Sequence, residues 1–186
     1  MIEISHSFDA PELPAYPSLG DPEKVVFFDI ETTGLSPYTS ALYLIGIMFF
    51  RDKTWHFHQW FSASLSDEIP VLQAFSDRLK DFETVVHYNG DTFDIPYLNA
   101  LYRQYHLDTP FDILKSVDIL KAARQLRPLL NPASLRQKHI EEALGIRRED
   151  PFTGAELIEV YRHWQQEPED RLLRDLLLHN EEDVKC

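Results

Sequence analysis

Two carboxylates close the first strongly apolar segment of the chain, Val25 to Ile30 (VVFFDI), whose composition is typical of a buried strand. Because side chains alternate between the two faces of a strand, Asp29 and Glu31 lie on the same face as Phe27. Burying two neighbouring ionised carboxylates is unfavourable unless a cation or a proton compensates their charge. The pair therefore indicates a divalent metal site. The alternative is a strand end whose carboxylates are simply solvated.

A second acidic segment, Asn89 to Asp94 (NGDTFD), falls between an expected strand that ends near Tyr88 and an expected helix. Carboxylates at such strand-to-helix turns lie where open α/β sheets bind their ligands. In the alternative reading, Asp94 caps the helix and Asn-Gly-Asp is ordinary turn chemistry.

The third acidic segment closes the last expected helix, residues 169–184. Spacings of four, three and four place four residues on one narrow stripe: Leu172, Leu176, His179 and Asp183. If the two leucines face the core, the histidine and the aspartate continue a buried line, and a buried aspartate needs a partner. The alternative is a solvated helix end, because residues 180–182 (Asn-Glu-Glu) are typical of a surface.

Together the three segments resemble the motifs of the DEDD exonuclease superfamily, which has an RNase H-like fold and includes the proofreading exonucleases, and especially its YprB-like branch. Residues 28–35 (FDIETTGL) resemble the first motif and residues 89–94 the second. Residues 179–183 (HNEED) are similar to the third. The likeness spans residues 25–186, and three motifs in the family's order are more specific than any one of them.

The resemblance implies roles for particular residues. His179 would be the general base, although its spacing from Asp183 is that of the family's tyrosine-bearing subgroup. Oxygen ligands suit two Mg²⁺ or Mn²⁺ ions, which can activate a water and stabilise a leaving oxygen. The implied metal ligands are Asp29, Glu31, Asp94 and Asp183, and the implied contacts to a terminal nucleotide are Thr32, Thr33, Gly34, Leu35 and Asn89.

The expected function is metal-dependent hydrolysis of phosphodiester bonds in DNA or RNA, as a 3'-to-5' exonuclease acting on single strands. Two alternatives stay open. One is an RNase H-like module that binds nucleic acid or a protein without cleaving, and the other is a structure-specific endonuclease with the same metal site. Asp183 lies near the end of the sequence, where a helix frays, which favours a fragment of a longer protein.

The remaining pattern predicts one α/β domain over residues 23–186, after an irregular arm over residues 1–22. Three antiparallel strands come first, and helices then alternate with strands, which indicates a mixed sheet flanked by helices. The expected strands are residues 25–30, 42–50, 54–61, 84–88 and 114–119, and the expected helices are residues 67–79, 94–105, 134–144, 156–165 and 169–184.

Composition narrows the classes of protein further. The 186 residues are 44% hydrophobic, which is enough for one globular core. There is no apolar run long enough to span a membrane and no signal peptide, so we expect a cytoplasmic protein. The single cysteine, Cys186, excludes a disulfide framework and a cysteine-rich zinc site.

Net charge is -13, which by itself argues against a nucleic-acid partner. Residues 115–148, however, contain eight basic and three acidic side chains. This local excess suits a phosphate backbone, or it simply solvates helix surfaces. Three further candidates are assigned structural roles: Asp118 as a helix cap, and His56 and His58 as ordinary strand residues.

Overall fold

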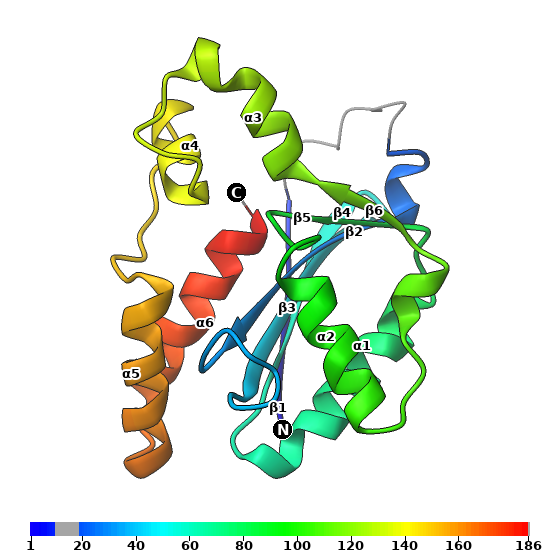
Figure 1. Cartoon of the computed structure of the whole chain (residues 1–186), viewed down its shortest axis with the longest axis vertical. Coiled ribbons are helices and arrows are strands. Elements are labelled where there is room, and N and C mark those ends of the chain that lie inside the picture. The colour runs from blue at the N-terminus through cyan, green and yellow to red at the C-terminus, as the bar shows by residue number, and fades with distance from the viewer. Residues whose placement is uncertain (10–18, 186) are drawn as a thin grey trace.

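A six-stranded mixed sheet forms the centre of the protein, as the computed structural model shows for residues 1–9 and 19–185 (Figure 1). The strand order is β1-β4-β3-β2-β5-β6. The strands are β1 (Ile2–Phe8), β2 (Val25–Thr32), β3 (Leu42–Arg51), β4 (Thr54–Phe61), β5 (Thr84–His87) and β6 (Lys115–Asp118).

The pairs β1–β4, β4–β3 and β3–β2 are antiparallel, whereas the pairs β2–β5 and β5–β6 are parallel. The hairpin between β3 and β4 turns at Asp52 and Lys53, whose φ angles are 52° and 64°. Two residues with positive φ match the right-handed twist of the strands, which is why such short turns join antiparallel neighbours. The predicted α/β mixed sheet is therefore confirmed.

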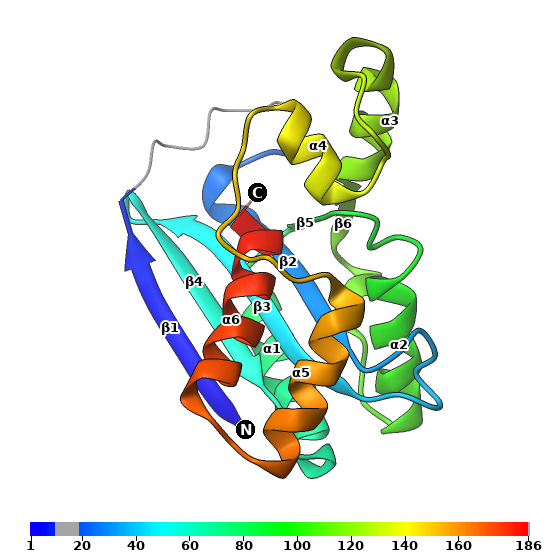
Figure 2. The ribbon, with the colours of Figure 1, turned by 90° about the vertical axis from the view of Figure 1, so that its left-hand side faces the viewer.

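Helices cover both faces of the sheet (Figures 1 and 2). Helices α1 and α2 pack on one face, α5 and α6 lie on the other, and α3 and α4 stand above the C-terminal end of α6. The helices are α1 (Glu68–Leu79), α2 (Asp94–Gln104), α3 (Ile119–Leu130), α4 (Gln137–Ala143), α5 (Gly154–Gln166) and α6 (Asp170–Lys185), with short 3₁₀ turns at Pro22–Lys24, Leu65–Asp67 and Pro110–Asp112.

Strand β2 sends alternate side chains to these two layers, as its sequence predicts. Val26, Phe28 and Ile30 pack in the core under α1 and α2. Phe27 instead packs on the opposite face, beside a cluster that contains Val184 of α6. Because Asp29 and Glu31 lie on the same face of β2 as Phe27, both carboxylates point toward α6.

The N-terminal arm is not irregular throughout, which corrects the prediction for residues 1–22. Residues 2–8 form the edge strand β1, which pairs with β4 from Ile2↔Phe61 to Phe8↔Trp55. An edge strand buries little, and only Ile2, Ile4 and Phe8 of β1 are half-buried, so its sequence carries a weak apolar signal. Residues 10–18 lie outside the described part of the chain.

Two helices differ from the predicted pattern. Helix α3 begins at Ile119, after its N-cap Asp118, and ends at Leu130, where Asn131 adopts a left-handed conformation. Helix α4 begins at Gln137 and not at Ser134, because the Ser134 hydroxyl contacts the amide of Arg136 and the ring of His139. In the described residues, no helix combines the length and the apolar character that crossing a membrane requires.

The core under α1 offers a test of the packing. Phe75 is fully buried, with ring centroids 5.6 Å from Phe28 and 6.1 Å from Phe111. We expect Phe75→Ala to lower the free energy of unfolding by about 3–5 kcal/mol, because it leaves a cavity. Urea unfolding measures this change. The control, Leu129→Ala, removes an apolar side chain that is 80% exposed, and a comparable loss there would contradict the assigned core.

Candidate functional site

Helix α6 lies close against the sheet where Asn180 covers Gly46. Asn180 is fully buried, and its Nδ2 donates to Oδ2 of Asp29 at 3.0 Å, while its Oδ1 accepts from Nε2 of Gln59 at 2.9 Å. Asp29, Gly46 and Gln59 lie side by side across β2, β3 and β4. A Cβ atom on Gly46 would overlap Oδ1 of Asn180. Because Gly46 has no side chain, Asn180 can lie over β3 and hydrogen-bond to both Asp29 of β2 and Gln59 of β4.

The interpretation of Asn180 as a surface residue is therefore wrong. It lies four residues from both Leu176 and Val184, which are also buried, so a second apolar stripe runs through it. This spacing in the sequence indicates that Asn180 is buried, whereas the two glutamates that follow it favour a position at the surface. Glu182 is also engaged, because its carboxylate accepts from the backbone amides of Glu149 and Asp150 at 2.8 and 3.0 Å.

Strand β2 places both of its carboxylates against α6. Glu31 is only 8% exposed, and its Oε1 lies 3.6 Å from Nε2 of His179. Its other oxygen is 3.5 Å from the hydroxyl of Tyr43. Asp29 is half-buried and receives the amide of Asn180. The solvated strand end considered as the alternative does not occur for Glu31.

Asp94 is the first residue of α2 and reaches back to β2. Its side chain is buried, and Oδ1 accepts from the backbone amide of Ile30 at 3.3 Å. Phe93 occupies the N-cap position, and no side chain caps this helix. Asp94 therefore does not act as the helix cap and instead joins the end of the turn to the strand that carries Asp29 and Glu31.

Asn89 shapes the turn that precedes α2. Its φ angle is 63°, in the left-handed region that asparagine tolerates. Its backbone amide donates to Asp118 at 2.8 Å, and its side-chain oxygen accepts from the hydroxyl of Thr92 at 2.7 Å. These contacts give Asn89 a turn-forming role, and contact with a substrate stays a prediction.

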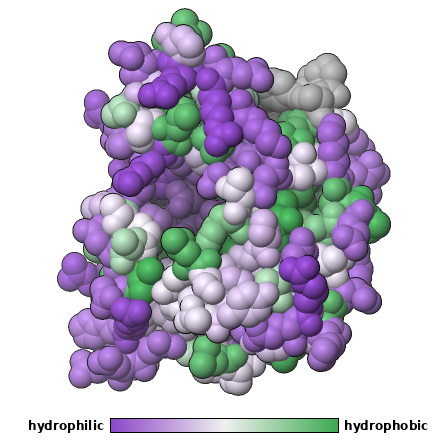
Figure 3. All heavy atoms as spheres, viewed as in Figure 1, coloured by the Kyte–Doolittle hydropathy of each residue, from purple (hydrophilic) through white to green (hydrophobic). Residues whose placement is uncertain are grey.

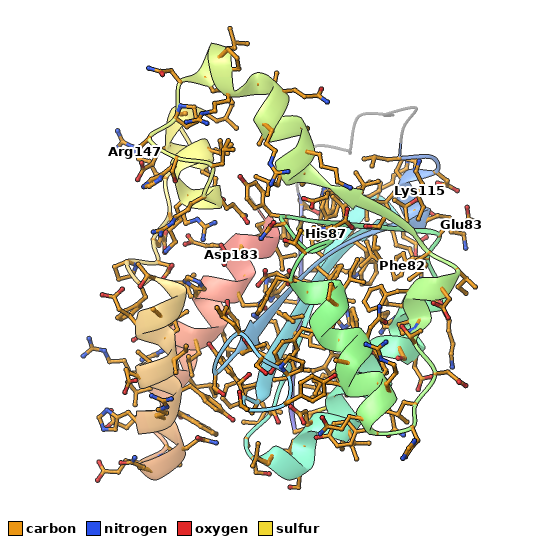
Figure 4. The ribbon with its side chains drawn as sticks, viewed as in Figure 1. Phe82, Glu83, His87, Lys115, Arg147 and Asp183 are labelled. Atoms are coloured by element: carbon orange, nitrogen blue, oxygen red, sulfur yellow. The ribbon has the colours of Figure 1, made fainter. Side chains whose placement is uncertain are left out.

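His179 and Asp183 bring the last turns of α6 to the same place. Nε2 of His179 lies 3.2 Å from Oδ2 of Asp183, and the other oxygen of Asp183 pairs with the guanidinium of Arg148. Figure 4 shows Asp183 near the C-terminal end of α6, below α4. The four carboxylates predicted as metal ligands thus come from β2, α2 and α6, far apart in the sequence, and the charge of Asp183 raises the pKa values of the other three.

Three of these carboxylates have pKa values above their usual range. Burial, followed by the neighbouring carboxylates, raises the pKa of Asp29 well above its usual value. Burial is also the largest cause that raises the pKa of Glu31 to about 8 and that of Asp94 to about 7, and the charge of Asp183 adds to both. At neutral pH these groups therefore hold protons or require a cation.

Asp183 behaves in the opposite way. Burial alone would raise its pKa, but the hydrogen bond and charge of His179, together with Arg148, lower it below the usual value. Burial likewise opposes the charged form of His179, yet Asp183 and Glu31 raise the pKa of this imidazole to about 9. His179 and Asp183 thus form an ion pair at the edge of the acidic cluster.

The donor set fits divalent cations. Ligand atoms of Glu31, His179 and Asp183 lie within 4.8 Å of one another, and Asp29 and Asp94 add further carboxylate oxygens beside them. Hard oxygen donors with excess negative charge are the ligands that Mg²⁺ and Mn²⁺ prefer. A cation would also relieve the repulsion that raises the three pKa values.

A second acidic group, at His87, Asp91 and Asp118, is explained by hydrogen bonds. Nδ1 of His87 accepts from the amide of Gly90 at 2.9 Å, and Nε2 lies 2.8 Å from the hydroxyl of Ser116. Both ring nitrogens are therefore engaged. Asp118 accepts from the amide of Leu120 at 3.0 Å, so it is the helix cap that the sequence predicts.

The loop after β2 is held by its own contacts. The hydroxyl of Thr32 donates to the carbonyl of Gly34 at 2.8 Å, and the hydroxyl of Thr33 accepts from the amide of Ala41 at 2.9 Å. Leu35 is 86% exposed. This large apolar side chain projects from a rigid loop and is available to a ligand.

The surface is hollowed beside the acidic cluster. Figure 3 shows a recess between the helices on the left and α2. A cavity of about 210 Å³ extends beside Asp29 and Asp183, with Phe27, Trp55 and Tyr88 in its lining. Solvent-sized molecules can therefore reach the carboxylates from a largely apolar side.

The basic residues between 115 and 148 divide into two groups. Arg124, Arg127, Arg136 and Arg147 are exposed on or near α3 and α4, and Figure 4 shows Arg147 directed outward. The side chain of Arg148 is only 6% exposed and pairs with Asp183. His56 and His58 lie within β4, as strand residues.

The contact between Asn180 and Gly46 predicts a coupled pair of substitutions. Gly46→Ala inserts a methyl group into the Asn180 amide and should lower stability by about 1–3 kcal/mol. Asn180→Ala leaves Gln59 and Asp29 without their buried partner, at a similar cost. In the double variant, the new methyl group occupies space that Asn180 has vacated. Urea unfolding should therefore give a loss smaller than the sum of the two single losses, and strict additivity would contradict this contact.

The raised pKa values predict how stability depends on pH. Folding raises the pKa of Glu31 from 4.5 to about 8, of Asp94 from 3.8 to about 7 and of His179 from 6.5 to about 9. For each group the stabilisation is complete below the unfolded pKa and is lost as pH rises through the folded pKa.

Metal-free protein should therefore melt at progressively lower temperature from about pH 5 to about pH 9. Mn²⁺ should raise the melting temperature most at the alkaline end, because it replaces the lost protons. Calorimetry with and without Mn²⁺ measures both effects. A metal-free melting temperature that stays level or rises over this range is the contrary result.

Comparisons with known proteins agree with this fold. Residues 26–186 match the family model described as RNase_H superfamily. Over 161 residues the chain is 30% identical to the uncharacterized protein YprB of Bacillus subtilis (strain 168). The matched region covers 85% of this chain and 38% of YprB. The chain therefore spans well under half the length of this relative.

A solved structure shares the fold. The family B DNA polymerase from the hyperthermophilic archaeon Pyrobaculum calidifontis superposes with a TM-score of 0.69 over 98% of this chain and 27% of the polymerase chain, at 16% sequence identity. At this identity the likeness concerns the fold alone. The family model, which matches nearly the whole chain, shows that this protein belongs to the RNase_H superfamily.

Proposed function

We propose that this protein hydrolyses phosphodiester bonds of DNA or RNA with the help of divalent cations, as a 3'-to-5' exonuclease on single strands. The observation that carries the proposal is that four carboxylates, Asp29, Glu31, Asp94 and Asp183, approach one another where the start of α2 and the end of α6 meet β2, so that the charge of Asp183 raises the pKa values of the other three. Membership of the RNase_H superfamily, with its nuclease-type fold, supports the same reaction.

In this proposal the four carboxylates share one role and His179 has another. The four together would hold two Mg²⁺ or Mn²⁺ ions, which supply Lewis acidity and an activated water when bound. Asp94 joins the α2 turn to β2 through the amide of Ile30, so its oxygens stay in register with those of Asp29. Bound cations would offset the carboxylate charges that raise the pKa of His179, so that Nε2 of the neutral ring, which faces Asp183 and Glu31, would accept a proton from the attacking water.

The surroundings favour a strand end as substrate. Leu35 projects from the rigid loop after β2, where it would pack against a terminal base, and Thr32 to Gly34 present backbone groups near the sugar. The acidic cluster repels phosphate until cations neutralise it, so binding of nucleic acid should require metal. The exposed arginines of α3 and α4 offer phosphate contacts above the site.

Cleavage assays with a matched pair of variants test the proposal. Oligonucleotides of single-stranded DNA and RNA, labelled at the 5' end, should shorten stepwise from the 3' end in Mn²⁺. Asp94→Asn should reduce the rate at least about 100-fold, because a lost metal ligand removes several kcal/mol of transition-state stabilisation. Asp91→Asn changes a carboxylate of the same turn that pairs with Lys121 and Ser116 and should keep the rate.

Further substrates separate the proposal from its rivals. A circular single strand has no 3' end and should resist, whereas its cleavage would indicate an endonuclease. Metal-dependent binding without hydrolysis of any substrate would indicate a binding module. Equal activity of Asp94→Asn and the unmodified protein, with both folded by circular dichroism, would exclude the assigned metal site.

A further inference from the structure

A three-residue segment, Arg148 to Asp150, lies along the last two turns of α6. Its side chains and amides contact three residues of that helix. Arg148 pairs with Asp183, the amides of Glu149 and Asp150 donate to Glu182, and Asp150 accepts from His179. This segment, which we call the clasp, belongs to none of the three sequence motifs.

The most buried member of the clasp is Asp150, whose side chain is 1% exposed. Its Oδ2 lies 2.6 Å from Nδ1 of His179 and 2.7 Å from Nζ of Lys138. Its Oδ1 accepts from the backbone amide of Phe152 at 2.9 Å. Three donors therefore hold the carboxylate rigidly, and they keep its pKa low despite burial.

The contact fixes the chemistry of the imidazole. An ionised carboxylate only accepts hydrogen bonds, so Nδ1 of His179 must carry the proton that it donates to Asp150. In the neutral ring, Nε2 then has the lone pair. Nε2 is the atom that faces Asp183 at 3.2 Å and Glu31 at 3.6 Å. The basic nitrogen thus points into the acidic cluster.

We propose that Asp150 is a positioning residue for His179, which fixes the imidazole tautomer and the ring orientation so that Nε2 can receive a proton at the carboxylate cluster. This inference rests on the proposed hydrolysis. It assigns a role to a residue outside the motifs, through a carboxylate–imidazole pair of the kind that orients histidines in many active sites. Arg148 does the corresponding work for Asp183, which it ties to Glu141 of α4.

Asp150→Asn, made together with Lys138→Met and compared with Lys138→Met alone, tests the proposal. The second change removes the ammonium that also donates to Oδ2 and would otherwise turn the asparagine oxygen toward His179. The asparagine Oδ1 can still accept from Phe152, which leaves the amide nitrogen in the place of Oδ2. An NH₂ group there donates, so Nδ1 of His179 must become the acceptor and the proton moves to Nε2. We expect kcat to fall at least about tenfold below that of Lys138→Met, with KM within about twofold.

Nitrogen-15 NMR of the histidine rings reports the tautomer directly. Spectra of the Mg²⁺-saturated protein would be recorded at a pH high enough that His179 is neutral, with His179→Gln to identify its signals. The unmodified protein and Lys138→Met should show Nδ1 protonated and Nε2 unprotonated. Adding Asp150→Asn to Lys138→Met should give the reverse.

The control is Glu182→Ala, which removes the acceptor of both clasp amides and leaves Asp150 in place. If Asp150 only anchored the clasp, the changes at Asp150 and Glu182 would slow the reaction alike, whereas we expect Glu182→Ala to keep the tautomer and most of kcat. An unprotonated Nδ1 in the unmodified protein, or an unchanged tautomer when Asp150→Asn is added to Lys138→Met, would overturn the inference.

The two possible failures are distinguishable. If no substrate is cleaved, the proposed function fails, and the NMR result still decides whether Asp150 sets the tautomer. If cleavage occurs and the tautomer does not respond to Asp150→Asn, the hydrolytic function stands and the positioning role is excluded.

Discussion

The close approach of α6 to the sheet depends on one contact, in which the amide of Asn180 lies over Gly46 and bridges Asp29 and Gln59. A larger residue at position 46 would hold the helix away from the strands. His179 and Asp183 flank this anchor on the same helix, so their distance from Glu31 follows from it. The geometry of the acidic cluster is therefore set by a glycine and an amide that take no part in the chemistry.

Folding also brings the carboxylates of the acidic cluster together against their mutual repulsion. Hydrophobic packing on both faces of β2 and beneath α6 forces carboxylates together, and the raised pKa values of Asp29, Glu31 and Asp94 record the unfavourable charge. Active sites are commonly such places, because the arrangement that a ligand needs is strained in its absence. Here a pair of cations would turn the repulsion into binding energy.

The basic side chains around the acidic cluster form two sets, one directed toward the cluster and one toward solvent. Arg148 and Lys138 are turned inward and hold Asp183 and Asp150, whereas the remaining arginines of the basic stretch stay in solvent. Arg148 and Lys138 of residues 115–148 therefore bind carboxylates, which neither alternative foresaw, and contact of the exposed arginines with a phosphate backbone stays a prediction.

Patterns in the sequence predict the strongly periodic elements and identify the acidic residues that are proposed to bind metal. Strand β4 and the alternation of β2 follow from pattern alone, and the mixed sheet was predicted correctly because strands and helices alternate clearly after residue 61. Three features emerge only in the folded chain: Asn180 is buried, residues 2–8 form an edge strand, and Asp150 contacts His179. The physical reason is common to all three, since each depends on a partner 29 or more residues away, which a local pattern does not contain.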